Sequence, residues 1–188
     1  MVSTVWDSAV LLSRWLISHA GVVERFGQVV ELGEIWVGGA MLVVQLNQQG
    51  AGTGLAGLVC SRINKRACVT LTDLPGCIKR LEANVALNKS TAKCSSLTWG
   101  ESTFQLLERS APCLVLAADC LLPYNPKLLI ALANTIVFLL QSHQQSEALV
   151  AFEERCNVEE FFTSLKTLKW EVVESLDKDT IKIVRITR

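Results

Sequence analysis

Residues 29–33 read VVELG, and residues 51–58 read AGTGLAGL. The first is an apolar segment that runs into a glycine, which predicts a buried strand. The second is a glycine-rich turn followed by apolar residues, which predicts the start of a helix. Together the two segments predict a strand, a tight turn and a helix, but residues 34–50 stand between them.

Residues 34–50 have an unusual composition for a loop. They contain the apolar run AMLVVQL, although a connecting loop belongs on the surface. Removing them restores a continuous VVELG-AGTGLAGL. Gly-Glu can be encoded GGT-GAG and Gln can be encoded CAG, and both sequences are typical of intron borders. We therefore interpret residues 34–50 as an insertion, either a retained piece of intron or a gene-model error read in frame.

Outward from this stretch, strands alternate with helices, which predicts an α/β fold with a mostly parallel sheet and helices on both faces. The last two predicted strands follow one another across the polar turn LDKD, so the last strand is expected to be antiparallel. The predicted strands cover 28–32, 67–72, 94–98, 113–118, 148–152, 170–174 and 180–187, and the predicted helices cover 6–20, 54–62, 75–88, 125–141 and 158–168. Gly21 is predicted to stop the first helix, and Pro75 to open the third.

Length and composition narrow the function classes. The 188 residues contain no linker or repeat, which predicts a single domain, 1–188, with 34–50 inserted into it. The 18 basic residues balance the 18 acidic ones, so neither nucleic acid nor a membrane is an expected partner. The seven cysteines form no CxxC pair, which predicts reduced thiols in a cytoplasmic or nuclear protein. Only two histidines are present, so no metal site is expected.

Marked residues follow three of the predicted strands. The strands end at Glu31-Leu32-Gly33, at Asp73 and at Asp119, and ligands of open α/β sheets bind beyond such ends. Asp73 lies 19 residues after Gly54, the separation expected of a carboxylate that accepts hydrogen bonds from ribose hydroxyls. The pattern predicts a site for a nucleoside cofactor. The alternative is that Gly52, Gly54 and Gly57 only pack a helix onto a strand.

Several longer motifs make a specific resemblance. They are VWDSAVLLSRWL at 5–16, VTLTDLPGCIKRLEANVALN at 69–88, LTWGE at 97–101 and LVLAADCLLPY at 114–124. In this order, together with the split glycine motif, they resemble the seven-β-strand protein-lysine methyltransferases known as methyltransferase family 16. The resemblance implies a Rossmann-like fold and S-adenosyl-L-methionine as cofactor. It also implies methyl transfer to a lysine of a protein substrate, the family's substrates including chaperones and AAA ATPases.

The resemblance also implies roles for single residues. The turn around the amino-acid part of the cofactor is assigned to Glu31, Gly33, Gly52 and Gly54, and the ribose to Asp73. Trp6 and Ala118 are assigned to other parts of the cofactor pocket, and Trp99 is assigned to the part near the adenine. The lysine site is assigned to Asp119 and Tyr124. As alternatives, Trp6 and Trp99 are core aromatics, and Asp73 and Asp119 are helix caps.

The chain departs from the family in two places. The family has tyrosine three residues after the aspartate, whereas this chain has Leu122 there and Tyr124 two residues later. The insertion separates Gly33 from Gly52, and the motif survives only if the insertion loops out and lets these glycines meet. We expect weakened or absent cofactor binding, because the turn must pack directly on the cofactor. Two other readings therefore remain: a non-catalytic isoform or interaction module of the same fold, and a methyltransferase for an acceptor other than lysine.

Overall fold

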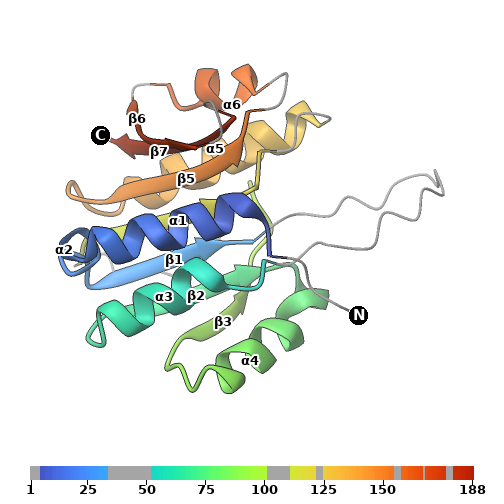
Figure 1. Ribbon diagram of the computed structural model, residues 1–188. Coiled ribbons are helices and arrows are strands. Elements are labelled where there is room, and N and C mark those ends of the chain that lie inside the picture. Colours follow the sequence, from blue (N-terminus) through green and yellow to red (C-terminus); the bar gives the residue numbers. More distant parts are fainter. Residues whose placement is uncertain are drawn as a thin grey trace.

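The computed structural model (Figure 1) describes residues 5–33, 52–100, 111–121, 125–154, 158–166, 168–176 and 180–188. These residues form a seven-stranded sheet in the order β3-β2-β1-β4-β5-β7-β6. The strands are β1 (Gln28–Leu32), β2 (Cys68–Asp73), β3 (Lys93–Ser96), β4 (Cys113–Ala118), β5 (Glu147–Glu153), β6 (Lys169–Leu176) and β7 (Ile181–Thr187).

Strand direction follows the expected pattern. β1 is central, and its Val30 lies opposite Thr70 of β2 and Val115 of β4 in parallel register. β3 and β5 extend the parallel part of the sheet on its two sides. β7 pairs antiparallel with both β5 and β6, so β7 alone runs against the other strands. The predicted α/β, Rossmann-like fold with an antiparallel last strand is confirmed.

Helices cover both faces of the sheet (Figure 1). They are α1 (Asp7–Ser18), α2 (Ala20–Val23), α3 (Leu55–Ile63), the 3₁₀ turn η1 (Pro75–Cys77), α4 (Ile78–Leu87), α5 (Pro126–Leu140) and α6 (Glu159–Ser164). Successive strand residues point to opposite faces. Val29 therefore packs with the cluster under α1, α3 and α4, and Val30 packs with the cluster under α5 and α6.

Two local predictions are corrected. The first helix ends at Ser18 and not at Gly21, which lies within α2. The backbone leaves the helical conformation at His19, with φ of −119° and ψ of 42°, and the His19 ring stacks on Trp15. Pro75 opens a 3₁₀ turn, and the α-helix begins only at Ile78.

The predicted insertion concerns residues that the structure does not describe. Residues 34–51 lie outside the described residues, so the single domain with an insertion stays a prediction. Across the residues that the structure does describe, no helix is long and apolar enough to cross a membrane.

Candidate functional site

The site lies where the strand order reverses. From β1 the chain builds outward through β2 and β3 on one side, and through β4 and β5 on the other. Parallel sheets bind ligands at the carboxyl ends of the strands at such a switch point. The residues there are Gly33 after β1, Asp73 at the end of β2, and Asp119 after β4. All three belong to the set predicted from sequence.

The two glycine segments on either side of the predicted insertion meet at Asp73. Gly33 donates its N–H to the Thr72 carbonyl oxygen at 2.9 Å. A Cβ atom on Gly33 would overlap that oxygen and lie 2.7 Å from Asp73 Oδ2, so only glycine fits. The Gly52 amide also acts on the Asp73 carboxylate and lowers its pKa. The strand end and the turn are therefore reunited in space.

Glu31 connects the end of β1 to the first turns of α3. Its Oε2 accepts a hydrogen bond of 2.7 Å from the Gly57 N–H, and the side chain is only 7 % exposed. A Cβ on Gly57 would lie 2.8 Å from the same oxygen, so Gly57 makes room for this contact. Burial raises the pKa of Glu31 to about 7, and the charge of Asp73 adds to the rise. The assignment of Glu31 to the cofactor stays a prediction.

The turn before α3 is held from two sides. Gly54 is the N-cap of α3 with φ of 72°, a conformation that glycine adopts without steric cost. On the other side, Asn84 of α4 donates its side-chain N–H to the Thr53 carbonyl oxygen at 3.0 Å. Sequence reasoning missed Asn84, because a single polar residue in a helix carries no signal for a contact 31 residues away.

Asp73 is the most deeply buried acid of the site, at 1 % exposed. Its Oδ1 accepts a hydrogen bond from the Leu74 N–H at 2.6 Å, whereas Oδ2 has no hydrogen-bond partner among the described residues. Hydrogen bonding from the Cys77 thiol and the Gly52 amide lowers the pKa of the carboxyl group, but neither donor satisfies Oδ2. Burial raises the pKa of Asp73 to about 6, against the lowering effects of the Leu74 amide and the Arg80 charge.

The alternative that Asp73 and Asp119 are helix caps does not fit. The N-cap of η1 is Leu74, with no side-chain cap, and the N-cap of α5 is Asn125. Asp119 instead adopts φ of 56°, which is uncommon for residues other than glycine and often marks functional sites. It is buried, and its N–H donates to the Ala151 carbonyl oxygen at 2.8 Å.

The structure describes some of the neighbours of Asp119, namely Ala118 and Cys120, but not Leu122 or Tyr124. Ala118 is half-buried at the end of β4. Cys120 is buried, and its thiol lies 3.4 Å from the Leu32 carbonyl oxygen, which ties the ends of β4 and β1 together. Tyr124 and Leu122 lie outside the described residues, so the assignment of Tyr124 to the lysine site stays a prediction.

The two predicted cofactor tryptophans lie in different surroundings. Trp99 is 4 % exposed and packs in the core cluster under α5, as the alternative of a core aromatic expects. The next residue, Gly100, donates its N–H to Thr135 Oγ1 of α5 at 2.9 Å, which fixes this segment on the helix. Trp6 is the N-cap of α1 and 37 % exposed, so it is not a core residue.

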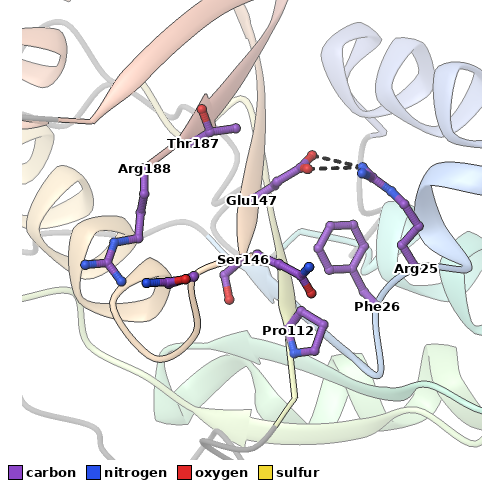
Figure 2. Close-up of a pocket in the computed structure, with 9 residues that line it drawn as sticks. Arg25, Phe26, Pro112, Ser146, Glu147, Thr187 and Arg188 are labelled. Carbon is purple, nitrogen blue, oxygen red and sulfur yellow. Dashed lines mark hydrogen bonds and ion pairs between the residues drawn. The ribbon is translucent and has the colours of Figure 1, made fainter.

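A separate cavity of about 460 Å³ opens at the amino ends of the parallel strands, on the other side of the sheet from the carboxyl ends where the candidate site lies (Figure 2). Pro112 and Ser146 of its lining precede β4 and β5, so the cavity lies at their amino ends. Figure 2 shows Arg25 pointing toward Glu147, and the two side chains form an ion pair of 3.1 Å. None of the residues assigned to the cofactor or the lysine site lines this cavity.

Comparison with known families decides the relationship. The family model described as lysine methyltransferase matches residues 1–168. The chain belongs to this lysine methyltransferase family. Mouse protein N-lysine methyltransferase METTL21A is 33 % identical over 151 residues, which cover 76 % of this chain and 54 % of the relative. Human protein-lysine N-methyltransferase EEF2KMT is 30 % identical over 190 residues, which cover 89 % of this chain and 51 % of the relative.

The family member thus spans about half the length of the curated relatives it matches. Solved structures confirm the fold at low identity. A T. thermophilus 16S rRNA N2 G1207 methyltransferase, solved with AdoMet and guanosine, has a TM-score of 0.66 at 14 % identity and covers 98 % of this chain and 44 % of its own. A ribosomal protein L11 methylase from Lactobacillus delbrueckii subsp. bulgaricus has a TM-score of 0.63 at 15 % identity and covers 100 % of this chain and 81 % of its own.

Proposed function

We propose that this chain binds S-adenosyl-L-methionine at the carboxyl edge of its sheet and transfers the methyl group to a lysine side chain of a protein. Family membership supports the reaction class. The observation that carries the proposal is Asp73, a buried carboxylate at the point where Gly33 and Gly52 meet, with one oxygen that no described residue satisfies. A buried acceptor without a donor costs about 1–3 kcal/mol, so a bound donor is the expected partner.

The residues fit the cofactor in two respects. Ribose hydroxyls are donors, and Asp73 Oδ2 is an acceptor without a donor among the described residues. Gly33 lacks a Cβ, and the Thr72 carbonyl oxygen and the Asp73 carboxylate occupy that space, so the end of β1 packs directly against the carboxylate that would bind the ribose. We assign the ribose to Asp73 and the turn beside it to Gly33, Gly52 and Gly54, with Glu31 holding the strand against α3. Trp6, Trp99 and Ala118 complete the proposed pocket.

The cofactor supplies a methyl group on a positively charged sulfur, which is already a good leaving group. The protein therefore has to hold the lysine nitrogen in line, without its extra proton and shielded from water. Desolvation favours loss of that proton, because burial disfavours a charged ammonium. We assign to Asp119 and Tyr124 the task of receiving and orienting the amino group by hydrogen bonds. A chaperone or AAA ATPase as substrate, and a cytoplasmic or nuclear location, are further proposals that rest on the family resemblance.

Isothermal titration with S-adenosyl-L-methionine tests the first half of the proposal. The chain is compared with a matched variant that lacks residues 34–50, in which VVELG and AGTGLAGL are continuous. Binding by both, with tighter binding by the shortened variant, is the expected result. No binding by either would contradict the proposal.

The second candidate is a catalytically inactive form of the same fold. The insertion favours it, because the turn that packs on the cofactor is interrupted in sequence. The meeting of Gly33 and Gly52 at Asp73 favours the enzyme. If only the shortened variant binds the cofactor, the inactive form is the correct reading of this chain.

Tritiated-methyl transfer into cell lysate tests the acceptor. Label that is lost to protease and retained after nuclease is expected for a protein lysine. Label lost only to nuclease would assign the chain to the third reading, a methyltransferase for a non-lysine acceptor.

A further inference from the structure

β6 lies at the edge of the sheet with one side open. Within the part of the chain that the structure describes, β7 is the one strand that pairs with β6. The strand has eight residues, and three of its large apolar side chains are exposed: Trp170 at 49 %, Val172 at 49 % and Leu176 at 43 %. The outer backbone groups of an edge strand are a template for another extended segment. This edge can therefore accept an eighth strand.

The charges near this edge are mainly acidic. β6 carries exposed Glu171 and Glu174, and the carboxyl end of β5 and the start of α6 add Glu153, Glu154, Glu159 and Glu160. The bases on or beside the same elements are Lys166, Lys169, Lys182 and Arg185, and Lys182 pairs with Glu154, so acids outnumber bases at this edge. Glu171 lies 3.5 Å from Arg185, whereas no ion pair reaches Glu174 among the described residues. A segment with basic side chains would complement this surface, because opposite charges on neighbouring strands are stabilising.

The same charges disfavour a second copy of the chain as the occupant. Two copies of this surface carry the same excess of acids and repel one another, whereas a basic segment is attracted. The register also shifts between Val172 and Glu174, and such an irregularity bends an edge and opposes continuous pairing between sheets. A basic partner segment meets no charge repulsion, and a single flexible segment can follow the bend that the irregularity introduces.

The position of β6 connects it to the proposed reaction. β6 and β4 run in the same direction, so the carboxyl end of β6 and Asp119, which follows the carboxyl end of β4, lie at the same end of the strands. The sheet order places β5 and β7 between them, and three strand spacings amount to roughly 14 Å. About four or five extended residues bridge that distance, at about 3.3 Å each.

We propose that the open edge of β6 is a docking strand for a basic, extended segment of the substrate that lies about five residues from the target lysine. This inference rests on the proposed function for the identity of the partner. Trp170, which packs against Phe162 with ring centroids 4.5 Å apart, offers a fixed apolar surface beside the docked segment.

A fluorescent peptide of about ten residues tests the docking strand without methyl transfer. The peptide alternates Arg and Val and carries one Lys near an end, and its binding to the full chain is followed by fluorescence anisotropy. Glu174→Lys is expected to weaken binding about tenfold, because it replaces an acid beside the docked strand by a charge that repels the basic peptide. Glu24→Lys, an exposed acid beyond α2, is the matched control and is expected to leave binding unchanged. Equal loss in both variants, or no binding by the unaltered chain, would overturn the proposal.

Backbone methylation of the peptide provides a second test that leaves the protein unaltered. Two further peptides carry N-methyl groups on alternate residues, one set on each edge of the extended chain. Pairing with β6 requires that one peptide lose binding at least about tenfold while the other retains it, because only one edge faces the strand. Equal binding by both would show that charge alone holds the peptide and would overturn the docking strand. Concentration-dependent dimerisation that blocks the peptide would identify a second copy as the occupant and overturn it as well.

The tests separate this inference from the proposed function. Peptide binding is measured without cofactor, and cofactor titration is measured without peptide. Cofactor binding and lysine methylation with no β6 effect would contradict the docking strand alone. Edge-specific peptide binding without any cofactor binding would contradict the enzyme and retain the docking surface.

Discussion

Charged side chains are placed differently at the carboxyl edge of the sheet, where the parallel strands end, and at its amino edge, where they begin. The carboxyl edge buries Glu31 and Asp73, and burial raises the pKa of both carboxyl groups. At the amino edge, Glu147 forms ion pairs with Arg25 at 3.1 Å and with Arg185 at 3.6 Å, and the Arg25 side chain is 54 % exposed (Figure 2). Both edges are built by the same strands, so the fold alone does not explain the difference.

This difference shows at which edge the molecule keeps buried ionisable groups although they lower the stability of the folded chain. A buried carboxylate with an unsatisfied oxygen destabilises the folded chain, whereas exposed ion pairs change its stability little. Groups that are kept despite such a cost cluster at functional sites. The carboxyl edge therefore has the energetic character of a binding site, and the amino edge that of an ordinary solvated surface.

Gly33→Ala is expected to have the largest effect at the carboxyl edge. The added Cβ overlaps the Thr72 carbonyl oxygen and crowds Asp73, and both are held in the sheet. We expect cofactor affinity to fall at least about 100-fold by titration calorimetry, and unfolding free energy to fall by about 3 kcal/mol in urea. Gly27→Ala, just before β1 at the amino edge, is the control, because its Cβ meets only Ala111 Cβ at 3.4 Å. A similar loss in both variants would end the contrast between the edges.

The pH dependence of stability is the next largest effect. The folded pKa of Glu31 is raised from 4.5 to about 7, so between these values the folded chain binds more protons than the unfolded chain. Stability from this group is therefore full below about pH 4.5 and falls as pH rises through 7, by about 3 kcal/mol in all. Urea unfolding at pH 5 and pH 8 measures the fall.

Glu31→Gln sharpens this measurement. The amide oxygen can still accept the Gly57 hydrogen bond but does not ionise. We expect the variant to lose much less stability than the unaltered chain between pH 5 and pH 8. An unchanged slope would show that Glu31 is not the group responsible.

Asp73→Asn tests the ribose assignment with a smaller effect. The neutral amide keeps the shape and removes the charge, so cofactor affinity is expected to fall about tenfold, while the apo chain is expected to gain stability at pH 8. Glu147→Gln at the amino edge is the control, with no expected change in affinity. Unaltered affinity in Asp73→Asn would remove Asp73 from the proposed cofactor site.

Arg25→Ala is expected to have the smallest effect. The ion pair with Glu147 is solvent-exposed on the arginine side, so its loss should cost about 0.5 kcal/mol. That cost should shrink at 1 M salt, where exposed charges are screened. Cofactor titration should show no change. A loss of several kcal/mol would show that the amino edge is not the ordinary surface described above.

Local features of the structure were largely predictable from sequence. Short apolar runs bounded by turn residues placed the inner strands to within a few residues, because parallel strands are buried on both faces, and alternation placed the last strand. Asp73 and Asp119 were predicted to stand at strand ends, and Asp73 is the last residue of β2 while Asp119 directly follows β4. The end of α1 at Ser18 was not predictable, because the backbone leaves the helix at His19, which is not a helix-breaking residue.

The amino-acid sequence by itself therefore determined which segments become strands and helices, and which residues stand at their ends, since these depend on neighbours along the chain. Only the tertiary structure decided that Gly33 and Gly52 meet at Asp73 across the intervening residues, that Glu31 turns toward Gly57, and that Trp99 lies in the core. The physical reason is that burial and hydrogen-bond partners are set by segments distant in sequence, which come together when the sheet forms.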